Sequence, residues 1–138
     1  MKFLRIFIIL SIVFILNSCN SEDEKKLPSI SIESIQVDEG NTTNYLEVML
    51  ALTNSVDYDL SVDVRTVDGT AIKGKDYTDL YEVIIFYAGQ EQASFNIEIL
   101  GDDIPEDNEI FSIRLENPHN VNIVNSTATI ALINDDEH

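Results

Sequence analysis

The chain has 138 residues, which is enough for one domain and not comfortably for two. It carries 25 acidic residues against 8 basic ones, and its formal net charge is −17. Because so negative a chain is repelled by phosphate backbones and by anionic membrane surfaces, we expect no nucleic-acid partner and expect cations or basic surfaces instead. The hydrophobic fraction of 44% is ordinary for a globular domain.

The N-terminus has the pattern of an export signal. Lys2 and Arg5 precede an almost uninterrupted apolar run over residues 6–16, which is too short to cross a hydrocarbon layer of roughly 30 Å as a helix. The Leu-Asn-Ser-Cys stretch that ends at Cys19 resembles the lipobox of bacterial lipoproteins, in which the cysteine is lipidated and becomes the first mature residue. We therefore predict a signal peptide over 1–18 and a lipid anchor at Cys19 that attaches the protein to a membrane. The alternatives are an uncleaved anchor and an ordinary secretory signal with an incidental cysteine.

Residues 19–28 are expected to form a flexible tether, because 20–26 are polar or charged and show no apolar periodicity. The acidic triplet 22–24 resembles the surface-export signal of lipoproteins in Bacteroidetes, and Asn20 is compatible with outer-membrane sorting. These features favour the cell envelope, with the outer membrane as the location and display on the cell surface as a further expectation.

From Ser29 onward apolar and polar residues alternate with period two, which is typical of half-buried β-strands. Seven strands are expected, at 30–36, 44–52, 59–67, 81–86, 92–100, 110–116 and 121–133, the last bent around Asn125. Seven such strands in about 110 residues predict an all-β domain over 29–138, built as a two-sheet antiparallel sandwich. Its expected core includes Phe95, Ile97, Phe111, Ile113, Leu115, Ile130 and Leu132.

The stretch 101–111 holds five carboxylates and no basic residue: Asp102, Asp103, Glu106, Asp107 and Glu109. Two carboxylates about 4 Å apart repel by roughly 4 kcal/mol at an effective dielectric constant of about 20, whereas a whole domain is stable by only about 5 to 15 kcal/mol. A hard divalent cation such as calcium, which binds roughly six to eight oxygen atoms, removes this repulsion. The stretch is therefore a candidate metal site, and the alternative is an acidic surface turn.

Strand parity gathers further carboxylates at the same end. If each strand reverses direction, the loops after the first, third and fifth strands and the end of the seventh lie at one pole. That pole holds thirteen carboxylates, whereas the opposite pole holds only Asp57 and Glu91. This distribution favours a calcium site with more than one ion, with uneven surface charge as the alternative. Outside 101–111 the members of the acidic pole are Asp38, Glu39, Asp68, Asp76, Asp79, Asp135, Asp136 and Glu137.

An ordered set of motifs in the chain resembles a Calx-beta domain. The set comprises Asp68-Gly69-Thr70-Ala71, Gly74, Asp76-Tyr77, Phe86, Gly89, the acidic turn with Phe111 and Leu115, and the terminal Asp135-Asp136-Glu137-His138. The resemblance covers about residues 29–138 and implies an immunoglobulin-like sandwich that binds calcium ions. As ligands it implies Glu39, Asp76, Asp102, the backbone carbonyl of Ile104, Glu106, Glu109, Asp135, Asp136 and the position of Glu137. We add Asp103 from the acidic stretch itself.

Two positions depart from the family pattern. Gly101 stands where calcium-binding members often have an aspartate, and Glu137 replaces an aspartate with a longer side chain. The resemblance therefore implies fewer or weaker ions than in the fullest sites. Among the other acidic residues, Asp68 is expected to form a turn, because Asp-Gly suits tight turns, and Asp79 and Asp107 are expected behind the ligands or in solvent.

No pattern for catalysis is present in the chain. His119 and His138 have no partner histidine or cysteine at a metal spacing, and no nucleophile elbow or phosphate-binding loop occurs. Tryptophan is absent, and the acidic pole is poor in the aromatic platforms that a glycosidase normally uses beside its paired carboxylates. We therefore expect that the protein is not an enzyme.

Two non-catalytic functions remain open. The first is a membrane-anchored surface module for adhesion or protein interaction, in which calcium makes one pole of the sandwich rigid. The second is a periplasmic or structural lipoprotein in which calcium only stabilises the fold or is absent. The partner, a protein or a glycan, is not indicated. Candidates for contact, each more often ordinary surface, are Tyr45, Asp57, Tyr58, Lys73, Lys75, Tyr81 and Tyr87.

Overall fold

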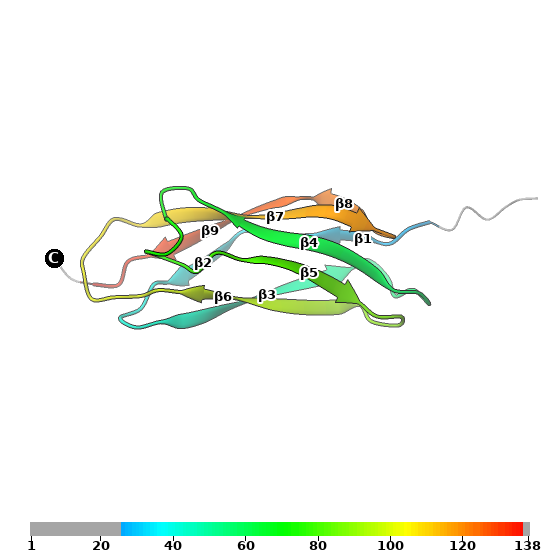
Figure 1. The fold of residues 1–138 in the computed structure, drawn as a ribbon, viewed down its shortest axis with the longest axis horizontal. Coiled ribbons are helices and arrows are strands. Elements are labelled where there is room, and N and C mark those ends of the chain that lie inside the picture. Colours follow the sequence, from blue (N-terminus) through cyan, green and yellow to red (C-terminus); the bar gives the residue numbers. More distant parts are fainter. Residues whose placement is uncertain (1–25, 137–138) are drawn as a thin grey trace, which may run out of the picture.

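The computed structural model describes residues 26–136, which form two β-sheets packed face to face (Figure 1). The predicted signal peptide and Cys19 lie outside the described residues. The strands of the described part are β1 (Ser29–Ser31), β2 (Ile35–Asp38), β3 (Asn44–Leu52), β4 (Leu60–Val67), β5 (Tyr81–Phe86), β6 (Gln92–Ile99), β7 (Glu109–His119), β8 (Asn122–Asn125) and β9 (Thr127–Ile133). None of residues 26–136 forms a helix long and apolar enough to cross a membrane.

One sheet has the strand order β6-β3-β1-β8 and the other has the order β2-β9-β7-β4-β5. The predicted sandwich is thus confirmed, but the first and last expected strands are each divided between the two sheets. The first breaks between β1 and β2, and the last breaks at Ser126, next to the expected bend at Asn125. The Asn125 side chain donates a hydrogen bond of 2.7 Å to the carbonyl oxygen of Ile32, which joins the two breaks.

The pairing also differs from a purely antiparallel sandwich. β1 pairs with β8 and β2 pairs with β9 in parallel, whereas the other strand pairs are antiparallel. The physical reason is that the segments 29–38 and 122–133 run in the same direction and change sheets side by side. A period-two pattern records which face of a strand is buried, and it does not record which strand lies beside it.

The core lies between the sheets, on the inward face of the alternating strands. All seven core residues expected from the sequence are buried there. Along β3, β4 and β6, buried residues alternate with more exposed ones, as the period-two pattern predicts. Large apolar side chains close the interior from both sheets, including Phe86, Phe95 and Phe111. This close packing holds the strand ends in place, so that the loops at each end are presented from a rigid base.

The ends of β2, β4, β6 and β9 lie at the same end of the sandwich, at the left of Figure 1 near the C-terminus. The loops 39–43, 68–80 and 100–108, together with residues 134–136, therefore gather at one pole, as strand parity predicted. This end is the acidic pole that the sequence predicts. β1 begins at the opposite end.

Candidate metal centre

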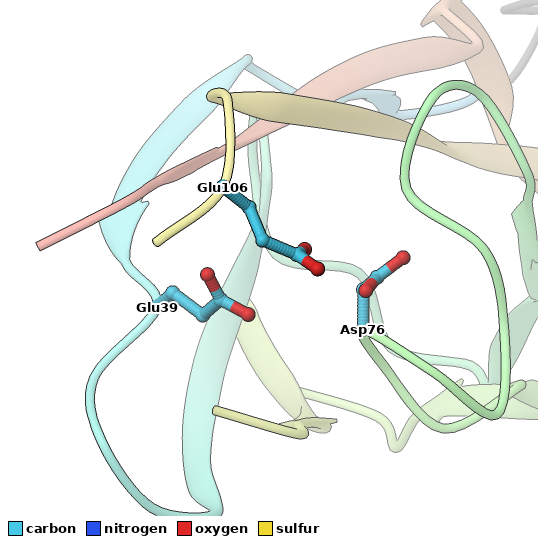
Figure 2. A group of neighbouring side chains, drawn as sticks. All are labelled: Glu39, Asp76 and Glu106. Atoms are coloured by element: carbon cyan, nitrogen blue, oxygen red, sulfur yellow. The ribbon is translucent and has the colours of Figure 1, made fainter. Parts of the chain in front are cut away.

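Three carboxylates from three separate loops converge at the acidic pole. Glu39, Asp76 and Glu106 each offer an oxygen atom, and these atoms lie within 4.8 Å of one another. Glu39 follows β2, Asp76 lies in the loop between β4 and β5, and Glu106 lies in the loop between β6 and β7 (Figure 2). We call these three residues the carboxylate triad.

Glu39 is held by its backbone. Its amide nitrogen donates to the carbonyl oxygen of Ile133 at 2.9 Å, and its own carbonyl oxygen accepts from the Asn44 side chain at 2.6 Å. The residue is only 9% exposed, and no group among residues 26–136 donates a hydrogen bond to its carboxylate. Burial, followed by repulsion from Asp102, Glu106 and other acidic neighbours, raises the pKa of Glu39 from 4.5 to about 7. A buried carboxylate without a donor is costly unless a cation or a proton neutralises it.

Hydrogen bonds hold both the backbone and the carboxylate of Asp76. Its carbonyl oxygen accepts from the Leu100 amide at 3.0 Å, its amide donates to the Ile72 carbonyl at 3.0 Å, and its Oδ2 accepts from the Ile72 amide at 2.7 Å. The neighbouring Tyr77 is fully buried and stacks on Phe111, with ring centroids 4.1 Å apart. The carboxylate therefore points into the triad from a loop that the core itself anchors.

The Asp-Gly-Thr-Ala motif attaches this loop to the start of β7. The Ala71 amide donates to the Ile110 carbonyl at 2.9 Å, and the Ile110 amide donates to the Thr70 hydroxyl at 2.8 Å. A side chain on Gly69 would place its Cβ 2.3 Å from that same carbonyl oxygen, so this close approach requires glycine. Asp68 accepts from the Tyr77 hydroxyl at 2.6 Å, within the loop, in keeping with its expected turn role.

The loop between β6 and β7 supplies Glu106 and ends at Glu109. The Glu106 amide donates to the Asn134 side chain at 3.3 Å, and its carboxylate is half-buried beside the other two members of the triad. Burial raises the pKa of Glu109, and a hydrogen bond with Asp76 raises it further. Glu109, the first residue of β7, therefore lies next to Asp76 of the triad.

The other predicted ligands lie around the triad and not within it. Asp102 accepts a hydrogen bond of 2.8 Å from the Ile104 amide inside its own turn. Its negative charge is close enough to Glu39 to raise the pKa of Glu39. Asp135 accepts from the Gly40 amide at 2.9 Å, and Asp136 accepts from the Asn41 side chain at 2.6 Å, so both are directed at the loop after β2. The remaining three are Asp103 and Ile104, which are exposed, and Glu137, which lies outside the described residues.

Lys75 is the residue at this site whose position sequence reasoning missed. Its Nζ lies 2.9 Å from both carboxylate oxygens of Glu106 and 3.3 Å from Oδ1 of Asp76. The hydrogen bond to Glu106, more than any other contact, holds the pKa of Lys75 well above its usual range. The signal for it in the sequence is its position directly before Asp76, a predicted ligand, although the sequence pattern alone predicts only a surface contact for Lys75.

Gly101 explains one departure from the family pattern. A Cβ at this position would lie 2.0 Å from the Gly40 carbonyl oxygen and 2.5 Å from the Glu39 carbonyl oxygen. The loop before β7 thus packs directly on the backbone that carries Glu39. An aspartate does not fit at position 101 unless these two loops move apart.

The fold and the triad define a β-sandwich domain with a candidate cation site at one pole. Residues 22–137 match the Calx-beta domain family, so the chain belongs to this family, as its motifs indicated.

Curated relatives are sodium/calcium exchangers. The chain is 37% identical over 79 residues to the sodium/calcium exchanger Calx of Drosophila melanogaster, a match that covers 56% of the chain and 8% of that protein. It is 42% identical over 66 residues to sodium/calcium exchanger 1 of Rattus norvegicus, covering 48% of the chain and 6% of the exchanger. The chain therefore spans less than a tenth of the length of these relatives.

Solved structures of Calx domains share the fold. The apo-form Calx CBD1 domain superposes with a TM-score of 0.72 at 29% identity, covering 80% of this chain and all of that one. The calcium binding domain CBD12 of CALX1.1 superposes with a TM-score of 0.70 at 30% identity, covering 78% of this chain and 44% of that one. These likenesses confirm the predicted immunoglobulin-like sandwich.

Proposed function

We propose that the protein is a non-catalytic calcium-binding module, anchored to a membrane of the cell envelope through lipid on Cys19. Calcium would join the loops of the acidic pole and present them for adhesion or protein interaction. The observation that carries the calcium part is the carboxylate triad, in which Glu39 is buried and has no hydrogen-bond donor among residues 26–136.

The residues of the triad fit a hard divalent cation. Their donor atoms are all carboxylate oxygens, which calcium prefers, and neither histidine nor cysteine belongs to this group. Glu39, Asp76 and Glu106 would hold the ion, with Glu109 and Asp102 adding negative charge close by. A bound cation neutralises charges that otherwise repel, and it thereby links three loops that are far apart in the sequence.

A solved relative supports the calcium part of the proposal. One solved structure of the same fold, 30% identical to this chain, is the calcium binding domain CBD12 of CALX1.1. Because the chain covers only 8% of the Drosophila melanogaster exchanger, the proposal is limited to calcium binding and does not include transport. The alternative is a periplasmic or structural lipoprotein in which calcium serves stability alone.

The calcium part is tested by equilibrium dialysis of radioactive calcium and by thermal unfolding, both with the full chain purified in a non-ionic detergent. A free ion at about 100 times its dissociation constant stabilises a fold by roughly 2.7 kcal/mol, and extracellular calcium modules bind at about 0.1 to 1 mM. We therefore expect saturable binding and a melting temperature that rises with millimolar calcium.

The informative variant is Glu39→Gln, because no donor among residues 26–136 would lose a hydrogen bond to the Glu39 carboxylate. It should weaken calcium binding by at least about tenfold, since a charged ligand is gone. In chelator it should melt above the parent, since a buried repelled charge is gone. The matched control is Glu47→Gln, which removes the same charge from an exposed position on β3. If the parent binds no calcium at 5 mM, roughly ten times the middle of the extracellular range, the proposal is wrong.

A further inference from the structure

The triad already contacts a cation, and that cation belongs to the chain itself. The Lys75 ammonium touches Glu106 through both carboxylate oxygens and touches Asp76 through one. Glu39, the third member, contacts no basic group of residues 26–136. Lys75 therefore neutralises part of the charge that calcium would neutralise, at two of the same three residues.

The backbone fixes where Lys75 stands. Gly74 has φ of +80°, a left-handed conformation that favours glycine, and the Lys75 amide donates to the Ile72 carbonyl at 3.1 Å. Its side chain is 55% exposed, whereas the Asp76 side chain is 3% exposed. The ammonium therefore approaches the triad from the solvent side and can withdraw toward water.

We propose that Lys75 is a tethered competitor of calcium, whose ammonium occupies oxygens of Asp76 and Glu106 and must leave them when the ion binds. This inference rests on the proposed calcium function and concerns the regulation of that same site. It assigns Lys75 two effects with opposite signs. The contact lowers carboxylate repulsion in the calcium-free protein, and it raises the calcium concentration needed for binding.

The size of the second effect follows from population arithmetic. Where only a fraction of the molecules has the oxygens free, the apparent dissociation constant increases by the inverse of that fraction. An ion pair as exposed as this one shifts such an equilibrium by about three- to fivefold. Lys75 would thus adjust the calcium threshold of the site by that factor, without abolishing binding.

The same loop provides a matched control. Lys73 forms an ion pair with Asp79 at 3.2 Å, its side chain is 53% exposed, and neither partner belongs to the triad. Lys73→Gln and Lys75→Gln therefore remove the same charge from the same loop, and their long-range effects on calcium attraction are similar. A difference between them reports the contact with the triad.

The experiment compares the parent, Lys75→Gln and Lys73→Gln as full chains in detergent and 0.15 M salt, by dialysis of radioactive calcium. We expect the dissociation constant of Lys75→Gln to be about three- to fivefold lower than that of Lys73→Gln. In chelator, Lys75→Gln should melt at a lower temperature than Lys73→Gln, because no basic group of residues 26–136 then contacts the triad.

A second measurement uses the parent alone and does not depend on a variant folding. Acetic anhydride labels exposed amines, and mass spectrometry follows the labelling of each lysine. Labelling of Lys75 should accelerate as calcium is added, with the midpoint seen in dialysis, while labelling of Lys73 should not change.

The two proposals fail in different ways. If the parent and both variants bind no calcium at 5 mM, the calcium function is wrong and the competition falls with it. The role of Lys75 is wrong if the parent binds calcium but the two variants have equal dissociation constants. It is also wrong if the parent binds calcium but calcium does not change the labelling rate of Lys75. In both cases the calcium site itself is retained.

Discussion

At the scale of single residues, Glu39 is the residue of the acidic pole with the most unfavourable electrostatic environment. The side chain is buried, it is surrounded by like charges, and no donor among the described residues contacts its carboxylate. Asp76, which is buried more deeply, instead accepts a hydrogen bond from the Ile72 amide and contacts Lys75. The two buried carboxylates of the triad are thus compensated unequally, and Glu39 should respond most to calcium and to protons.

Glu39 therefore predicts a pH dependence of stability. Without calcium its pKa in the folded state is about 7, against 4.5 for the ordinary group, so between these values the folded protein holds a proton that the unfolded chain has lost. The free energy of unfolding should fall as pH rises through this window, by at most about 3 kcal/mol from this residue. Urea unfolding in chelator at pH 5 and pH 8 measures the change. Glu39→Gln should flatten the slope, and an equal slope in both proteins would contradict the prediction.

Gly101 carries a second prediction at this scale. Gly101→Ala forces a Cβ against the backbone of Gly40, so either the loop before β7 or the loop after β2 must shift. We expect a loss of about 1 to 3 kcal/mol in the free energy of unfolding, together with weaker calcium binding, because Glu39 lies on the displaced backbone. Denaturant unfolding and calcium dialysis measure the two effects. Unchanged values for both would show that the contact between these loops is not tight.

At the scale of elements, the loop between β4 and β5 decides the geometry of the site. It carries Asp76 and Lys75, it docks on the start of β7 through Ala71, and Tyr77 inserts its ring into the core. A loop of thirteen residues without regular structure is usually mobile or functional, and this one is held at both ends. The core and the site are therefore coupled through the stack of Tyr77 on Phe111.

Phe111→Ala tests this coupling. The ring is fully buried, so its removal should cost roughly 3 to 5 kcal/mol through lost burial and a cavity. Because Tyr77 loses its stacking partner, calcium affinity should fall as well, although Phe111 is not a ligand. Thermal unfolding and calcium dialysis check both effects, with Met49→Ala, at an exposed position of β3, as the control. A soluble variant that melts like the parent would show that the register of β7 is wrong.

At the scale of the whole molecule, the sandwich places the acidic pole and the start of β1 at opposite ends. The acidic pole lies at the ends of β2, β4, β6 and β9, whereas β1, which follows the predicted tether, begins at the opposite end (Figure 1). A lipid anchor at Cys19 would therefore attach the domain by the end that is far from the triad. This arrangement would suit the proposed module, because the loops of the acidic pole would then face away from the membrane.

Cys19→Ser tests the anchor. Serine cannot form the thioether to lipid, so the variant should leave the membrane fraction or keep its signal peptide unprocessed. Cell fractionation and the mass of the purified chain measure these outcomes, and labelling of intact cells with an impermeant reagent separates surface display from a periplasmic location. Unchanged attachment and processing would remove the lipoprotein proposal, and the calcium site would be unaffected.

The sequence by itself determined the sandwich, its core and the pole at which the carboxylates gather. These properties follow from local signals: alternation sets which face of a strand is buried, turns mark the strand ends, and parity sets the pole. The family resemblance already named Glu39, Asp76 and Glu106 among its candidate ligands. Only the tertiary structure decided that these three are the ones that converge, whereas Asp135 and Asp136 are directed at the loop after β2. It also decided that Lys75 enters the triad. The physical reason is that these arrangements depend on contacts between loops distant in the sequence, such as the carbonyl of Asp76 on the amide of Leu100, which no local pattern records.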